Sequence, residues 1–195
     1  MLSTPIMATE KPSYQSIEKT GDFELRLYAP MIVAETYVEG SFDQASTAGF
    51  RLIAGYIFGD NRAQDGASGQ KIAMTAPVTM ETGSQKIDMT APVTMESSAG
   101  RWRISFVMPA RYSMATLPTP NNPRVTLREI PEQRTAAIVF SGFAGEGKVK
   151  TKTEALLAWM AARGLEPVSA PQLARYDPPW TLPFFRHNEI LVAYR

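Results

Sequence analysis

Residues 23–38, FELRLYAPMIVAETYV, decide the fold. In Phe23–Leu27 apolar and charged residues alternate, which is the pattern of a half-buried strand. Ala29–Pro30 predicts a turn, and Met31–Val38 is rich in the apolar and β-branched residues that strands favour. Gly40 ends the second strand. The segment therefore predicts two successive strands of a sheet.

A helix is predicted directly after this pair of strands. Ser41 is a suitable N-cap, and apolar residues recur from Phe42 to Ile57 at the spacing of one helical face. Gly59 ends the helix. Further strands are expected in the region Lys71–Met95 and at Trp102–Met108.

The second half of the chain follows the same plan. Strands are predicted at Val125–Ile130 and Thr135–Phe140, and a helix from about Lys148 to Arg163. Two later strands are expected at Gln172–Tyr176 and Glu189–Tyr194. One constant shift places Leu25 and Arg26 on Leu127 and Arg128, which suggests an internal repeat.

We therefore predict an α+β fold. Two pseudo-symmetric strand–strand–helix–strand–strand repeats, about 14–117 and 124–195, would form a single distorted antiparallel β-barrel with two helices packed outside. Pro118–Pro123 is the short Pro-rich link between the halves. Because each half alone would leave a sheet edge uncovered, one domain is expected over residues 1–195.

Composition limits the chemistry of this chain. Its 20 Lys and Arg nearly balance 19 Asp and Glu, so no basic footprint for nucleic acid is present. The chain has no Cys, and His187 is its single histidine. Thiolate metal sites, a Cys nucleophile and any mechanism with two imidazoles in one subunit are thereby excluded. Because the chain has few reactive side chains, we expect a binding protein rather than an enzyme.

The sequence limits the cellular compartment and the oligomeric state less strictly than it limits the chemistry. No apolar run reaches the roughly 20 residues that span a bilayer, and no signal peptide is visible. We expect a soluble protein of the cytoplasm or periplasm without an integral membrane segment. The sequence does not determine the oligomeric state, although a monomer is favoured.

A second repeat is much sharper. Residues 71–81, KIAMTAPVTME, recur as residues 86–96 with one difference in eleven positions. The intervening residues Glu81–Ser84 predict a turn, so the two copies are expected to form a methionine-rich hairpin. One interpretation is a core strand with an inserted copy. The other is a flap over a ligand site, because Met suits adaptable apolar surfaces.

Two motifs carry a resemblance to a known family. Lys71–Val78 resembles the first signature of the SOUL family, also called the haem-binding protein family. Residues 176–190, which include Arg186-His187-Asn188-Glu189, resemble its second signature. The doubled Met-Thr-Ala-Pro-Val run resembles bacterial members. The resemblance implies a distorted barrel that binds haem or another tetrapyrrole non-covalently in a shallow apolar site, as a carrier, buffer or sensor.

The resemblance also implies where the ligand lies. Position by position, the apolar contacts on the first helix would be Phe50, Ile53 and Ala54. The basic residues that the family places near the haem propionates fall on Thr47 and Gly55 here.

Arg51 is expected to take over the role of propionate partner, since it lies one turn from both of these positions. Met74 and Met89, one from each copy of the repeat, are the expected contacts from the flap.

Several alternatives remain open at this stage. His187 is a candidate haem ligand, although we favour a solvated basic pair with Arg186. A small-molecule hydrolase or ligand-binding module of the related regulator-type barrel would use Glu35, Glu39 or Glu189. A protein-interaction module would use the methionine-rich hairpin. Phe184 and Phe185 are expected in the core.

Overall fold

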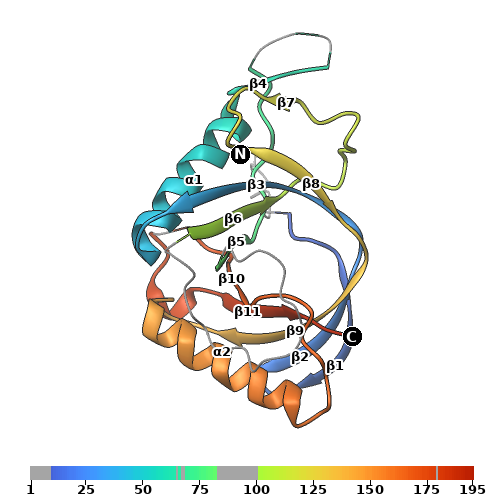
Figure 1. Cartoon of the computed structure of the whole chain (residues 1–195), viewed down its shortest axis with the longest axis vertical. Helices are drawn as coiled ribbons and strands as arrows, with labels where there is room; N and C mark the ends of the chain where they lie inside the picture. Colours follow the sequence, from blue (N-terminus) through green and yellow to red (C-terminus); the bar gives the residue numbers. More distant parts are fainter. Residues whose placement is uncertain (1–9, 65, 67–68, 83–100, 179) are drawn as a thin grey trace, which may run out of the picture.

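A strongly curled antiparallel sheet with two helices on its outside makes up most of the molecule (Figure 1). The structure is a computed structural model that describes residues 10–64, 66, 69–82, 101–178 and 180–195. The first strands are β1 Tyr14–Thr20, β2 Phe23–Tyr28, β3 Met31–Glu39, β4 Asn61–Arg62, β5 Val78–Thr82 and β6 Arg101–Val107. The later strands are β7 Thr119–Pro120, β8 Thr126–Ile130, β9 Gln133–Phe140, β10 Gln172–Arg175 and β11 Asn188–Ala193. The helices are α1 Phe42–Phe58, α2 Glu146–Ala161 and the 3-10 turn η1 Pro183–Phe185.

The α+β class is confirmed, and strands from both halves share one sheet. The nine strands lie in the order β1-β2-β9-β11-β10-β5-β6-β3-β8, while β4 and β7 pair separately. Thus β2 pairs with β9 of the second half, and β8 pairs with β3 of the first. Among the described strands β1 and β8 remain edges, so the expected barrel is an open curl rather than a closed one.

The two halves have similar topology. In the strand order from β2 to β8, each strand of one half mirrors a strand of the other half. The mirrored pairs are β2 and β8, β3 and β9, β6 and β11, and β5 and β10. Helix α1 packs against β3 and β6, and α2 packs against their counterparts β9 and β11. This order is compatible with the predicted duplication, which remains a prediction.

Most predicted elements are present within two residues of their expected ends. The main omission is β1, Tyr14–Thr20, whose polar sequence gave no strand signal because all of its residues are exposed at a sheet edge. In the first copy of the doubled motif, the strand begins only at Val78 and continues to Thr82, one residue past the copy. The second copy, and with it the hairpin, lies outside the described residues.

The main core lies between the helices and the outer face of the sheet. Leu25, Ala136, Ile138, Ile190 and Val192 belong to this buried cluster. Because side chains alternate along a strand, Glu24 and Arg26 of β2 point to the other face, inside the curl. They are nevertheless buried. The curl therefore covers the face that the alternation in residues 23–28 would assign to solvent.

Helix α1 packs closely on the sheet because Gly49 faces it. A Cβ added at Gly49 would lie 2.3 Å from Cγ1 of Ile104, whose side chain is buried in β6. A Cβ added at Gly55, one and a half turns further on, would meet nothing within 4 Å. Gly49 thus allows the helix to approach the sheet, whereas Gly55 faces open space.

This contrast predicts opposite effects of two identical substitutions. Gly49→Ala should lower the free energy of unfolding by about 1–3 kcal/mol, because the added methyl group overpacks a buried contact. Gly55→Ala should leave it unchanged or raise it by up to about 1 kcal/mol, because Ala favours helix. Urea unfolding of both variants measures the difference. Equal effects would show that α1 does not depend on a close approach at Gly49.

Candidate functional site

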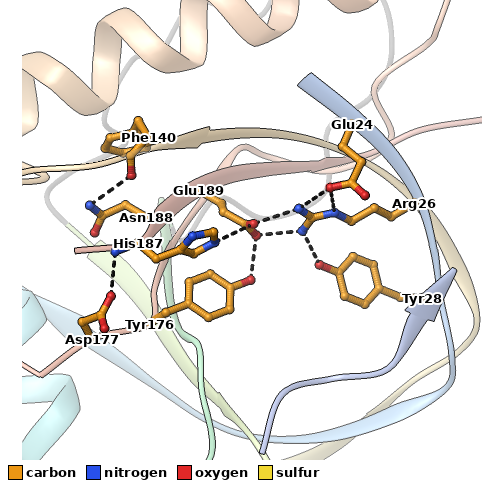
Figure 2. Close-up of polar contacts among 9 residues, drawn as sticks. All are labelled: Glu24, Arg26, Tyr28, Phe140, Tyr176, Asp177, His187, Asn188 and Glu189. Atoms are coloured by element: carbon orange, nitrogen blue, oxygen red, sulfur yellow. Dashed lines mark hydrogen bonds and ion pairs between the residues drawn. The ribbon is translucent and has the colours of Figure 1, made fainter. Parts of the chain in front are cut away.

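The interior of the curl holds a buried ionic network centred on Arg26 (Figure 2). Its guanidinium donates from Nε and Nη2 to Oε2 of Glu24, at 2.9 and 2.7 Å. Nη1 and Nη2 donate to the two carboxylate oxygens of Glu189, both at 2.8 Å. Nη1 also donates to the hydroxyl of Tyr28 at 3.0 Å. All five N–H bonds of the guanidinium are thereby used within the protein.

The carboxylate of Glu189 is equally well satisfied. Besides Arg26, it accepts a hydrogen bond from the Tyr176 hydroxyl at 2.6 Å and contacts Nε2 of His187 at 2.9 Å. Since an ionised carboxylate only accepts hydrogen bonds, Nε2 of His187 carries the proton. In neutral His187 the other nitrogen, Nδ1, is then a bare acceptor.

Protonation states follow from these contacts. Burial raises the pKa of Glu189, but hydrogen bonds from His187, Arg26 and Tyr176 outweigh it and lower the pKa to about 2. Burial raises the pKa of Tyr28 to about 12 and also raises that of Tyr176. Glu189 is therefore ionised near neutral pH, and both phenols are protonated.

A cavity of about 270 Å³ opens beside this network. Its walls include Tyr14, whose ring lies 4.3 Å from the Arg26 guanidinium, and Tyr176, whose ring lies 5.0 Å from Nζ of Lys11. None of its described lining residues is a Ser, Thr or Cys. The described residues also form no cluster of three or more His, Asp or Glu fit for a metal ion. This cavity offers hydrogen bonds and aromatic walls to a small ligand, and its described lining has no Ser, Thr or Cys nucleophile.

A second polar group lies further along the inner face. Arg128 of β8 donates from Nη2 to Oε2 of Glu35 at 2.8 Å, and Arg103 pairs with Glu81. Burial raises the pKa of Glu81, although Arg103 and Gln172 oppose the shift. The cavity beside these residues holds only about 70 Å³.

The outer side of α1 is different, because it exposes apolar groups to solvent. Phe50 is 40% exposed, with its ring centroid 5.5 Å from that of Phe106, and Phe58 is 57% exposed. At 100° per residue, Phe50, Arg51, Ala54 and Phe58 fall within about 100° of one another around the helix axis. These residues form one strip, which we call the α1 strip.

The comparisons with known proteins give the family. A family model described as SOUL heme-binding protein matches residues 9–193, nearly the whole chain. The chain belongs to the SOUL heme-binding protein family. The match supports haem or tetrapyrrole binding at the level of the family. No curated protein matches the chain.

Solved structures confirm the fold of this SOUL protein. The C-terminal domain of EcmrR is 12% identical with a TM-score of 0.63, and the match covers 93% of this chain and 98% of that one. A hydrolase from Listeria innocua is 14% identical with a TM-score of 0.55, covering 92% and 94%. An uncharacterized conserved protein from Listeria innocua is 14% identical with a TM-score of 0.57, covering 89% and 92%. At such identities the likeness shows the fold alone.

The predicted contacts of the SOUL site are distributed over two environments. Phe50 and Arg51 are exposed on the α1 strip, and Ala54 lies at its base. Ile53 is fully buried on the sheet side of α1, so it cannot touch a ligand on the outer face. The family resemblance did not separate these positions, because it assigned them one by one along a single helix.

The two predicted methionine contacts, Met74 and Met89, have separate outcomes. Met74 is 39% exposed, in a segment held against α1 by a hydrogen bond from Ile72 N to Ile57 O at 2.9 Å. Met89 lies outside the described residues. Across the described residues no helix is long and apolar enough to cross a membrane.

The structure also gives the surroundings of His187 and of the three predicted acids. His187 is not solely a solvated basic residue, because it donates to Glu189 and lines the larger cavity. Glu35 is buried against Arg128, whereas Glu39 is exposed. Glu189 is buried, but its lowered pKa is the opposite of what a general acid requires. The geometry therefore does not support Glu189 as the general acid of a hydrolase, and the hydrolase alternative stays a prediction.

Sequence reasoning missed Arg26 and Tyr176 as partners of Glu189, and Tyr28 as a partner of Arg26. The one available signal was the charged pair Glu24 and Arg26 within an otherwise apolar strand. That signal is also typical of a solvent-facing strand, so the sequence alone could not separate the two cases.

The network predicts how stability depends on pH. The pKa of Glu189 is lowered from 4.5 to about 2, so its ionisation stabilises the fold at neutral pH. By linkage this contribution, roughly 3 kcal/mol, is complete above the unfolded pKa and is lost as the pH falls from about 5 to 2. Glu189→Gln should be less stable at pH 7 and should show a shallower decline in acid.

Urea unfolding at a series of pH values between 2 and 7 measures this effect. Glu132→Gln is the matched control, because Glu132 is exposed in the turn between β8 and β9 and should leave the wild-type pH dependence unchanged. A wild-type slope in the Glu189→Gln protein would contradict the assignment.

Proposed function

We propose that this SOUL protein binds haem or a related tetrapyrrole non-covalently on the α1 strip, as a carrier, buffer or sensor. The observation that carries the proposal is a pair of exposed Phe side chains with one cation on α1, in a chain that belongs to a haem-binding family. A planar macrocycle with acidic side groups is matched by an apolar surface beside a cation.

The shape of the strip favours a flat ligand. Phe50 and Phe58 border it, and the small residue Ala54 lies between them. Gly55 adjoins the strip, and space is open where its side chain would be. A macrocycle can therefore lie against the helix backbone between two aromatic rings.

Size favours this surface over the polar cavity. Pockets that enclose drug-sized ligands measure about 300–1,000 Å³. The cavity beside Arg26 holds about 270 Å³. Opening it further would separate Arg26 from carboxylates that would then stay buried without a partner, at a cost of about 3–5 kcal/mol. A tetrapyrrole is better accommodated outside the curl.

Arg51 is the proposed partner of a propionate. It is exposed on the strip, and no ion pair or hydrogen bond links it to another described residue. Its guanidinium can pair with a carboxylate through two parallel hydrogen bonds. Ile53 supports the helix from the core side. Met74, in the segment held against α1, would add an apolar contact for the ligand. Met89 remains an expectation from the sequence.

Titration with haemin tests the site. The wild type should give a saturable change in the Soret band. Phe58→Ala should weaken binding about fivefold, because about half of a large apolar contact is lost. Arg51→Ala should weaken it about two- to fivefold, the usual value of an exposed ion pair.

Two control variants match these substitutions in chemistry and exposure. Phe184→Ala removes an exposed Phe far along the chain, and Lys150→Ala removes an exposed cation from α2. Both should bind haemin as the wild type does. The absence of any Soret change in the wild type would refute haem binding. A loss confined to Phe184→Ala would refute the α1 strip as the site.

His187 provides an independent prediction. Because its Nε2 donates to Glu189 inside the curl, His187→Ala should leave the position and amplitude of the Soret band of the haemin complex unchanged. Absorbance of wild type and variant at equal haemin occupancy measures this. Loss or displacement of the band would show that His187 ligates the iron and that the α1 strip is not the haem site.

A further inference from the structure

Five large apolar side chains are exposed on one surface that neither the cavities nor the α1 strip uses. Trp180 is 82% exposed, and Leu182, Phe184, Phe185 and Phe143 are each more than half exposed. Gly142 N donates to Pro183 O at 2.9 Å, which holds the segment of Phe143 beside η1. We call these five residues the aromatic patch.

The patch overturns one expectation from the sequence. Phe184 and Phe185 were predicted in the core, yet they are 66% and 70% exposed. The chain maintains this exposure with specific contacts. Nε of Arg186 donates to Thr181 O at 2.8 Å, and the Arg186 guanidinium lies 4.8 Å from the ring centroid of Phe143. An apolar surface that is held open in this way is typical of an interaction site.

We propose that the aromatic patch docks the protein on the surface of a lipid bilayer that contains anionic lipids. Trp, Phe and Leu are the residues that bury into the boundary between headgroups and acyl chains. Here all of the patch residues except Phe143 lie on a short segment, with Pro178 and Pro183 limiting its backbone freedom.

The backbone of the segment favours a lipid occupant over a protein partner. Polar backbone groups that enter a bilayer need partners within the protein, whereas a protein partner can supply them. Pro178 and Pro183 have no N–H. Thr181, Phe185 and Arg186 donate their N–H groups to carbonyls of the same segment, at 3.0, 3.0 and 3.1 Å. Three of the six N–H groups in residues 180–186 are therefore satisfied within the segment.

Charge near the patch complements anionic headgroups. Residues 178–188 contain no Asp or Glu, and Arg186 lies among them. The acids at either end are already bonded inside the protein, because Asp177 accepts the backbone N–H of His187 at 2.6 Å and Glu189 belongs to the Arg26 network.

The neighbouring helix adds further cations. Lys148 and Lys150 of α2 are exposed, and the one exposed acid in the first turn of α2 is Glu146. Nζ of Lys148 donates to Ser141 O at 2.6 Å, which places it next to the segment of Phe143. The surroundings of the patch are thus cationic on balance, and anionic lipids attract such surfaces.

Flotation with vesicles tests the proposal directly. The full-length protein should float with vesicles of phosphatidylcholine and phosphatidylserine, and less with phosphatidylcholine alone. Added salt should weaken the binding to anionic vesicles. Trp180→Ser and Phe184→Ser should each reduce partitioning about tenfold, because each removes one large buried contact.

Ile17→Ser is the control, since Ile17 is also an exposed apolar residue, at 51%, on β1. Its neighbour Glu18 pairs with Arg163 just beyond the end of α2, whereas the aromatic patch adjoins the start of α2. At 1.5 Å per residue the two places are separated by most of the helix length. Ile17→Ser should partition like the wild type.

Fluorescence locates the contact. Trp102 and Trp159 are partly buried, so quenching by brominated lipids should come from Trp180 and should disappear in Trp180→Phe while flotation persists. Absence of flotation with either vesicle, or equal flotation of the Ser variants, would overturn the proposal. So would a concentration-dependent dimer that Trp180→Ser abolishes without vesicles, because it would assign the patch to a second copy of the chain. Normal haemin titration in either case leaves the proposed function intact.

Discussion

The buried guanidinium of Arg26 is the constraint to which the interior of this SOUL protein conforms. A buried cation is tolerated only when its charge and its hydrogen bonds are compensated. Arg26 meets this condition by donating to Glu24, Tyr28 and Glu189. The pairing reaches from β2 across β9 to β11, so it requires strands from both halves of the chain to lie in one curled sheet. Removing Arg26 would leave two buried carboxylates without their cation.

This compensation also separates the molecule into two kinds of surface. Inside the curl every strong donor of Arg26 and every acceptor of Glu189 is already used, and His187 is held in one tautomer. Outside the curl, the α1 strip and the aromatic patch expose apolar groups next to cations. The sites that we propose for a tetrapyrrole and for a lipid surface therefore lie on the outside, where binding would break no buried ion pair.

Much of the local structure could be predicted from the sequence. The helix after Ser41 and its end at Gly59 follow from periodicity and capping, and the strand at residues 31–39 follows from its β-branched residues. The edge strand β1 was missed because an exposed edge needs no apolar pattern. On α1, the family resemblance grouped Ile53 with Phe50, although one faces the core and the other faces solvent. Periodicity identifies a helix, but it cannot state how closely a sheet approaches it.

Residues 23–28 illustrate which features the sequence determines and which depend on the tertiary structure. Its alternation by itself determined a strand with Phe23 and Leu25 on one face and Glu24 and Arg26 on the other, because side chains in a strand alternate. Only the tertiary structure decided that the charged face is buried, because burial depends on how far the sheet curls and on Glu189 arriving from the far end of the chain. The same reason explains Phe184 and Phe185. Their apolar character was evident in the sequence, but their exposure depends on the η1 segment being held against Gly142.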